Sequence, residues 1–188
     1  MGAVLRVPTA DLASWAADLS MTHSLTLTAG CYPDRSFDPE TSFRPFLKRL
    51  FAEIAHELRD HPRRYVARMS QDEFPAFFGF YEATTRAGAP YPHVHGVIAL
   101  GRGEEEHLRA ILRTRWGTDK EAGITSPYLR HHPSLSVALR GVCRTKRDWR
   151  PTFELKPMRS DHWLGYSAKK YASTSTIWTH ADILNLTH

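Results

Sequence analysis

Cysteine is scarce in this chain, with only Cys31 and Cys143 among 188 residues. Disulfide-built domains and zinc knuckles need more cysteines or C-x-x-C pairs, so the sequence excludes both classes. Long apolar runs and a signal-peptide pattern are also missing, which argues against a membrane span and against export. We therefore expect a soluble protein of a reducing cytoplasm, with no membrane partner.

Further absences narrow the possible functions and the expected number of domains. The sequence has no G-x-x-x-x-G-K-[ST] loop, which excludes a nucleotide-driven motor of the P-loop kind. It also has no internal repeat, low-complexity segment or long linker. A chain of this length suits one domain with a real hydrophobic core. We expect a single domain over residues 1–188, without a helicase domain.

Basic residues outnumber acidic ones, 25 against 20, for a formal charge of +5. Such a balance favours a polyanionic partner. The segment 140–150 is the densest basic run, and it is either a solvated loop or a contact for a DNA backbone. We favour DNA contact because an interleaved tryptophan can stack on an unpaired base. The residues assigned to DNA contact are Arg140, Arg144, Lys146, Arg147 and Trp149 of this run, together with Lys170 further along the chain.

Hydrophobic periodicity predicts an α+β fold. Alternating or branched segments predict strands over 24–29, 74–81, 92–100, 135–142 and 152–155, and the first of these should be half-buried. A loop over 83–91 joins the second predicted strand to the third, so we expect these two to form an antiparallel hairpin. Apolar stripes at helical spacing predict helices over 9–19, from Ser42 to before Pro62, over 103–116 and over 160–172. In the second of these, Ser42 is the expected N-cap and Pro45 is tolerated in the first turn. The main order is β-α-β-β-α-β-β-α, so we expect one antiparallel sheet with helices on one side, near to ferredoxin-like architectures.

The segment 92–100 carries a His-x-His pair. Side chains two residues apart on a strand share a face, so His93 and His95 point the same way and Val94 points to the other face. Two neighbouring imidazoles can bind one divalent cation; alternatively, they are two polar residues at a strand end. His131 and His132 form the nearest rival pair.

The helix predicted over 160–172 presents a second candidate. Tyr166 lies away from the apolar side, which includes Tyr171, and Lys169 and Lys170 follow it by three and four residues. A cationic neighbour favours phenolate and attracts phosphate. The alternative is an ordinary solvated helix face.

Three segments together resemble the motifs of HUH endonucleases: the strand Leu25–Thr28, His93-Val94-His95 followed by Gly96, and Tyr166-x-x-Lys169. This family contains the rolling-circle replication initiators (Rep proteins) of small phages, plasmids and single-stranded DNA viruses, with tyrosine transposases as relatives. The resemblance spans about residues 24–172 and implies a ferredoxin-like or RRM-like HUH endonuclease fold.

The resemblance also implies a third metal ligand on the strand before the histidine pair. Glu82 fits that place, although it could equally be an exposed carboxylate at a strand end; Asp72 and Glu73 precede the strand and fit less well. The implied cofactor is Mn²⁺ or Mg²⁺. Two imidazoles favour a site that at least accepts Mn²⁺, because Mg²⁺ prefers oxygen ligands.

The implied activity is metal-dependent, site-specific nicking and joining of single-stranded DNA. Tyr166 would be the nucleophile, giving a 5′-phosphotyrosine and a free 3′ end, and Lys169 would screen charge on the phosphate, with Lys170 as the alternate. Some relatives use two tyrosines one helical turn apart. Tyr171 lies five residues after Tyr166, which turns it about 140° away, so we expect one catalytic tyrosine.

The implied partners are single-stranded or hairpin origin DNA and a separate helicase, in the cytoplasm of a bacterial host cell. A single-tyrosine HUH transposase is the enzyme alternative. Relaxases fit less well, because their nucleophile usually precedes the histidine motif. The non-enzymatic alternative is a basic nucleic-acid-binding domain whose histidine pair is structural.

Overall fold

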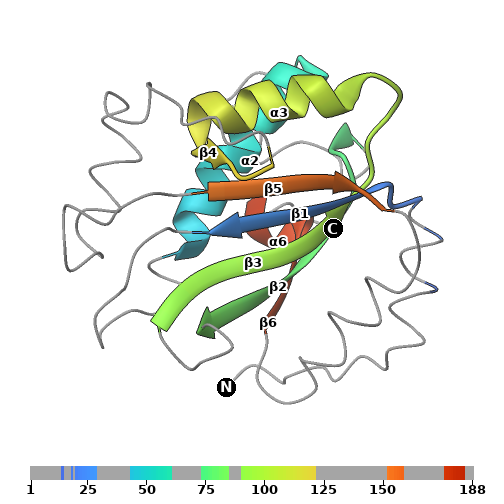
Figure 1. The fold of residues 1–188 in the computed structure, drawn as a ribbon. Coiled ribbons are helices and arrows are strands. Elements are labelled where there is room, and N and C mark those ends of the chain that lie inside the picture. The colour runs from blue at the N-terminus through green and yellow to red at the C-terminus, as the bar shows by residue number, and fades with distance from the viewer. Residues whose placement is uncertain are drawn as a thin grey trace.

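The computed structural model of this chain describes residues 14, 18, 20–28, 43–60, 73–84, 90–121, 152–158 and 176–184. Its strands form one sheet in the order β4-β5-β1-β3-β2-β6, antiparallel throughout except between β4 and β5 (Figure 1). The strands are β1 (His23–Thr28), β2 (Phe77–Thr84), β3 (Pro90–Ile98), β4 (Thr118–Asp119), β5 (Thr152–Pro157) and β6 (Thr176–Thr179). The helices are α2 (Arg44–Arg59), α3 (Glu104–Arg115) and α6 (His180–Leu184). The predicted α+β class with a single sheet is confirmed.

The sheet has two faces of different chemistry. One face carries apolar side chains and lies against the helices; we call it the helix face, and its members include Leu25, Leu27, Phe77, Val94, Ile98, Phe153 and Leu155. The other carries the histidine pair and is called the histidine face. Its polar members include Ser24, Thr26, Thr28, Glu82, His93 and His95, and the buried apolar residues Phe78, Phe80 and Val97 lie on it as well. In Figure 1, α2 and α6 lie behind the sheet, so the histidine face is turned to the viewer.

Strand β1 is central and is buried on both faces. Its alternation of polar and apolar residues was predicted, but the prediction of a half-buried strand was wrong. The hydroxyl side chains of Thr26 and Thr28 are only 8% and 4% exposed. They can be buried because each makes a side-chain hydrogen bond, to His95 and to Thr152 respectively.

Helix α2 packs its predicted apolar stripe into the core, where Leu47, Leu50 and Ile54 are fully buried. Pro45 lies in its first turn, as predicted, where a missing N–H costs nothing. The cap prediction was wrong, since the N-cap residue is Phe43 rather than Ser42. Phe43 anchors this end of the helix by apolar contact instead, with its ring 5.9 Å from that of Tyr81.

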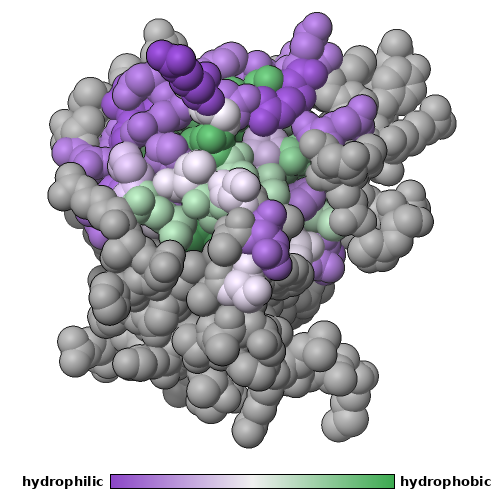
Figure 2. All heavy atoms as spheres, turned by 90° about the vertical axis from the view of Figure 1, so that its right-hand side faces the viewer, coloured by the Kyte–Doolittle hydropathy of each residue, from purple (hydrophilic) through white to green (hydrophobic). Residues whose placement is uncertain are grey.

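Ion pairs join helices α2 and α3. Arg59 of α2 contacts Glu104 of α3, and Arg115 of α3 contacts Glu53 and Glu57 of α2. Hydrogen bonding from Arg59 keeps the pKa of Glu104 below its usual value, although burial opposes this. Hydrophilic side chains accordingly gather at the top of Figure 2, where these two helices lie.

A buried ion network fastens α3 to the edge of the sheet. The Arg109 guanidinium contacts the fully buried Asp119 of β4 at 3.1 Å and donates to the Leu155 carbonyl of β5 at 2.8 Å. Burial lowers the Arg109 pKa, but hydrogen bonds to Glu105 and Asp119 outweigh it, so the net shift is upward. The same contact with Arg109 lowers the pKa of Glu105.

Several predicted boundaries need correction. Strand β2 begins at Phe77 rather than Phe74, and β2 and β3 extend into the predicted loop 83–91, because backbone pairing continues to Thr84 and Pro90. Strands β4 and β6 and helix α6 were not predicted. The predicted strand 135–142, the predicted helix 160–172 and most of the predicted helix 9–19 lie outside the described residues. Within the described part of the chain, no helix is both long enough and apolar enough to cross a membrane.

Candidate metal centre

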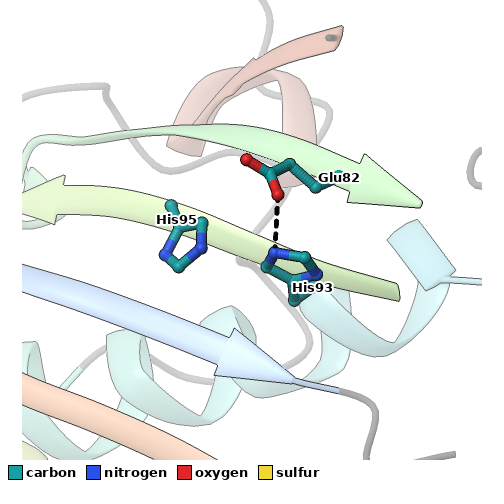
Figure 3. A group of neighbouring side chains, drawn as sticks. All are labelled: Glu82, His93 and His95. Atoms are coloured by element: carbon teal, nitrogen blue, oxygen red, sulfur yellow. Dashed lines mark ion pairs between the residues drawn. The ribbon is translucent and has the colours of Figure 1, made fainter. Parts of the chain in front are cut away.

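Strand β3 places both histidines on the histidine face, as its period of two requires. Val94 between them is fully buried in the core on the opposite side. The His93 and His95 rings lie with their centroids 4.7 Å apart and their planes nearly perpendicular, at 88°. The shared orientation predicted from the His-x-His spacing is confirmed (Figure 3).

Glu82 reaches the same place from the neighbouring strand. The antiparallel register of β2 and β3 sets Glu82 directly opposite His93, and a carboxylate oxygen of Glu82 (Oε2) lies 2.9 Å from His93 Nε2 (Figure 3). The predicted hairpin between the two strands is confirmed. Glu82 lies inside β2 rather than at an exposed strand end, and its side chain is only 16% exposed.

These three side chains form the candidate metal centre. The ligand atoms that Glu82, His93 and His95 offer all lie within 4.8 Å of one another, and no other group of this kind occurs among the described residues. Two imidazole nitrogens and one carboxylate oxygen suit a first-row transition ion better than Mg²⁺. A set of three protein ligands also leaves coordination positions open for a substrate oxygen.

Thr26 of β1 is a neighbour of this centre that the sequence analysis did not single out. The β1–β3 register pairs Thr26 with His95, and the Thr26 hydroxyl oxygen lies 2.9 Å from His95 Nδ1. The available signal was the alternation in β1, which places Thr26 on its polar face. Alternation alone does not say which strand becomes the neighbour, so the contact could not be predicted.

Gly96, which follows the histidine pair, leaves room for a side chain that packs on the helix face. A Cβ atom at this position would lie 2.4 Å from the Phe77 ring and 2.8 Å from the Phe78 carbonyl oxygen. Glycine is therefore needed here for the close approach of the Phe77 ring to β3. The residue supports the strand that carries the histidines and contributes no ligand atom.

Of the remaining candidate residues, the structure describes only Glu73; Asp72, like the others, lies outside the described residues. Glu73 is exposed and precedes β2, so it is no member of the group, as expected. The other predicted site residues lie outside the described residues: Tyr166, Lys169, Lys170, Arg140, Arg144, Lys146, Arg147 and Trp149, together with the rival pair His131 and His132.

Comparison of the chain with protein-family models, with curated proteins and with solved structures found no match.

Proposed function

We propose that this chain is an HUH-type endonuclease that nicks and rejoins single-stranded DNA and so initiates rolling-circle replication of a phage, plasmid or small virus. The observation that carries the proposal is the meeting of Glu82 with His93 and His95 on one face of the sheet. The resemblance of the sequence motifs to this family led us to expect that ligand set from two separate strands.

The ligand set fits a divalent cation on chemical grounds. All three groups are neutral or anionic donors when they bind a metal, and the carboxylate offsets part of the charge of the ion. Mn²⁺ suits two imidazoles and one carboxylate, and Mg²⁺ is the alternative. A cation held there would polarise the scissile phosphate and offset the negative charge that develops in the transition state.

Tyr166 is the proposed nucleophile, on the basis of the family resemblance. Its phenolic oxygen forms a bond to phosphorus as the phenolic proton is lost, and the bond from phosphorus to the 3′ oxygen breaks. The departing 3′ oxygen takes up a proton, which leaves a 3′ hydroxyl and a 5′-phosphotyrosine. Lys169, or Lys170 in its place, screens the charge of the reacting phosphate. The phosphotyrosine ester conserves the energy of the broken phosphodiester bond. Attack by a 3′ hydroxyl on the phosphorus of this ester therefore releases Tyr166 and rejoins the strand.

DNA would be held by contacts outside the metal centre. The basic run that ends near β5 supplies cations for the phosphate backbone and Trp149 for stacking on a base. The substrate is single-stranded or hairpin origin DNA, and strand separation is assigned to a separate helicase. A transposase would use the same chemistry on different DNA ends, so cleavage of an origin hairpin rather than element ends distinguishes the two.

A covalent adduct tests the proposal. The full chain is incubated with Mn²⁺ and a library of labelled single-stranded oligonucleotides, and a labelled protein band is sought under denaturing conditions. We expect the adduct with the wild type, none with Tyr166→Phe and none after chelation of Mn²⁺. Tyr171→Phe is the matched control, because it removes a hydroxyl from the same segment and should keep the adduct.

Three results would contradict parts of the proposal. An equal adduct in the wild type and Tyr166→Phe would remove Tyr166 as the nucleophile. DNA binding without any adduct, at any Mn²⁺ concentration, would favour the non-enzymatic binding domain. Loss of Mn²⁺ binding in His93→Ala but not in Glu82→Ala would remove Glu82 from the ligand set.

A further inference from the structure

The Thr26 side chain contacts the candidate metal centre from β1, a strand that contributes none of the three candidate ligands. Its hydroxyl oxygen lies 2.9 Å from His95 Nδ1, and the residue is only 8% exposed. The backbone pairing of β1 with β3 places Thr26 directly opposite His95, so the sheet itself holds the two residues side by side. A β-branched residue on a central strand is also restricted to few rotamers.

This contact decides which ring nitrogen of His95 can bind an ion. A neutral imidazole carries one proton, and a metal takes the nitrogen without it. When Nδ1 carries the proton and donates it to the Thr26 oxygen, the lone pair is on Nε2. A partner of this kind fixes both the tautomer and the orientation of a metal-binding histidine.

The two histidines are therefore held in different ways. His93 contacts the Glu82 carboxylate through Nε2 at 2.9 Å, whereas His95 contacts a neutral hydroxyl through Nδ1. The carboxylate that faces Thr26 across the sheet is Glu154 of β5, and it contacts Lys156 at 2.9 Å. Thr26 thus orients His95 without adding a second negative charge beside the ligand set.

We propose that Thr26 is a positioning residue of the metal centre, which holds His95 as the Nδ1–H tautomer so that the Nε2 lone pair can bind the ion. The metal-binding role of this contact rests on the function proposed above. The competing explanation is that the hydrogen bond only ties β1 to β3. Ser24 provides the comparison, because it lies on the same strand and face and its hydroxyl donates to the Lys156 backbone carbonyl, at 3.4 Å.

The experiment uses the full chain with Thr26→Val, Thr26→Ser and the control Ser24→Ala. Long-range ¹H–¹⁵N NMR correlations of the metal-free protein at about pH 8, where imidazoles are mostly neutral, report the tautomer; His95→Gln identifies the His95 signals. Calorimetry with Mn²⁺ reports the affinity. We expect an Nδ1–H tautomer of His95 in the wild type, lost in Thr26→Val and kept in the other two variants. Mn²⁺ affinity should fall about tenfold in Thr26→Val alone.

The possible results separate this inference from the proposed function. An Nε2–H tautomer in the wild type, or unchanged Mn²⁺ affinity in Thr26→Val, overturns the positioning role. If the wild type binds no Mn²⁺, the metal-dependent function and the metal-binding role of Thr26 both fail, and the NMR tautomer still shows whether Thr26 orients His95. If Thr26→Val does not fold, the wild-type tautomer and the Mn²⁺ affinity of Thr26→Ser decide the question, since a hydroxyl that orients His95 should work in either residue.

Discussion

The two faces of the sheet use the same strands for different purposes. On β3, Val94 and Ile98 are fully buried in the helix face, while His93 and His95 point to the histidine face. On β1, Leu25 and Leu27 lie in the core, and Thr26 contacts His95 on the other side. Because alternate side chains of a strand point to opposite faces, the same strand supplies residues both to the core and to the candidate site.

The difference between the faces lies in how their side chains are stabilised. Burial of apolar side chains on the helix face stabilises the fold in proportion to the area removed from water, whichever apolar groups they contact. Polar side chains on the histidine face need specific hydrogen-bond or ionic partners to be buried at all. We therefore expect substitutions in the apolar core of the helix face to lower stability, and substitutions of the polar side chains around Glu82, His93 and His95 to lower ion binding.

Leu27→Ala should have the largest effect on stability. Leu27 is fully buried, and truncation of a buried leucine costs about 2–5 kcal/mol. The matched change on the other face is His95→Gln, which should abolish Mn²⁺ binding with a smaller loss of stability. Chemical denaturation measures both; a larger loss in His95→Gln would contradict the division between the faces.

Mn²⁺ should stabilise the protein through the histidine face alone. A ligand that binds only the native state at about 100 times its Kd raises the free energy of unfolding by about 2.7 kcal/mol. Thermal unfolding with and without Mn²⁺ should show this gain in the wild type and in Leu27→Ala. The gain should be missing in His93→Ala, and its persistence there would place the ion elsewhere.

Gly96→Ala should lower stability by about 1–3 kcal/mol, as overpacking does. The added methyl group would meet the Phe77 ring and the Phe78 carbonyl oxygen. Phe77→Leu in the same chain should relieve only the clash with the ring, so the double variant should lose less than the sum of the two single variants. Urea denaturation of the three variants measures this coupling, and strict additivity would contradict it.

Glu104→Gln should have the smallest effect, about 1 kcal/mol or less, because the side chains of the Arg59–Glu104 ion pair both keep partial contact with water. The pKa of Glu104 is lowered by Arg59, so the carboxylate stabilises the fold above the unfolded-state value near 4.5 and loses this contribution as the pH falls through its lower folded-state pKa. Unfolding at several pH values should show the wild type and the variant converging in acid. Mn²⁺ affinity at neutral pH should be equal in both.

Much of the fold could be predicted because local patterns report local structure. The stripe of α2 and the alternation of β1 follow from side-chain periodicity, and the confirmed β2–β3 hairpin follows from the adjacency of two strands. The short strand β4 could not be predicted, since two residues show no periodicity and its pairing with β5 joins distant segments of the chain. The ends of the strands were missed because they are set by backbone pairing with a neighbouring strand, which the side-chain pattern of one strand does not report.

The sequence by itself determined that His93 and His95 share a face, because the geometry of a strand requires it. The resemblance to HUH endonucleases made Glu82 a candidate ligand, as the carboxylate on the preceding strand. Only the tertiary structure decided that Glu82 lies opposite His93 and Thr26 opposite His95, because register depends on long-range backbone pairing. Contacts between strands far apart in the chain are a property of the whole sheet, and no local pattern contains them.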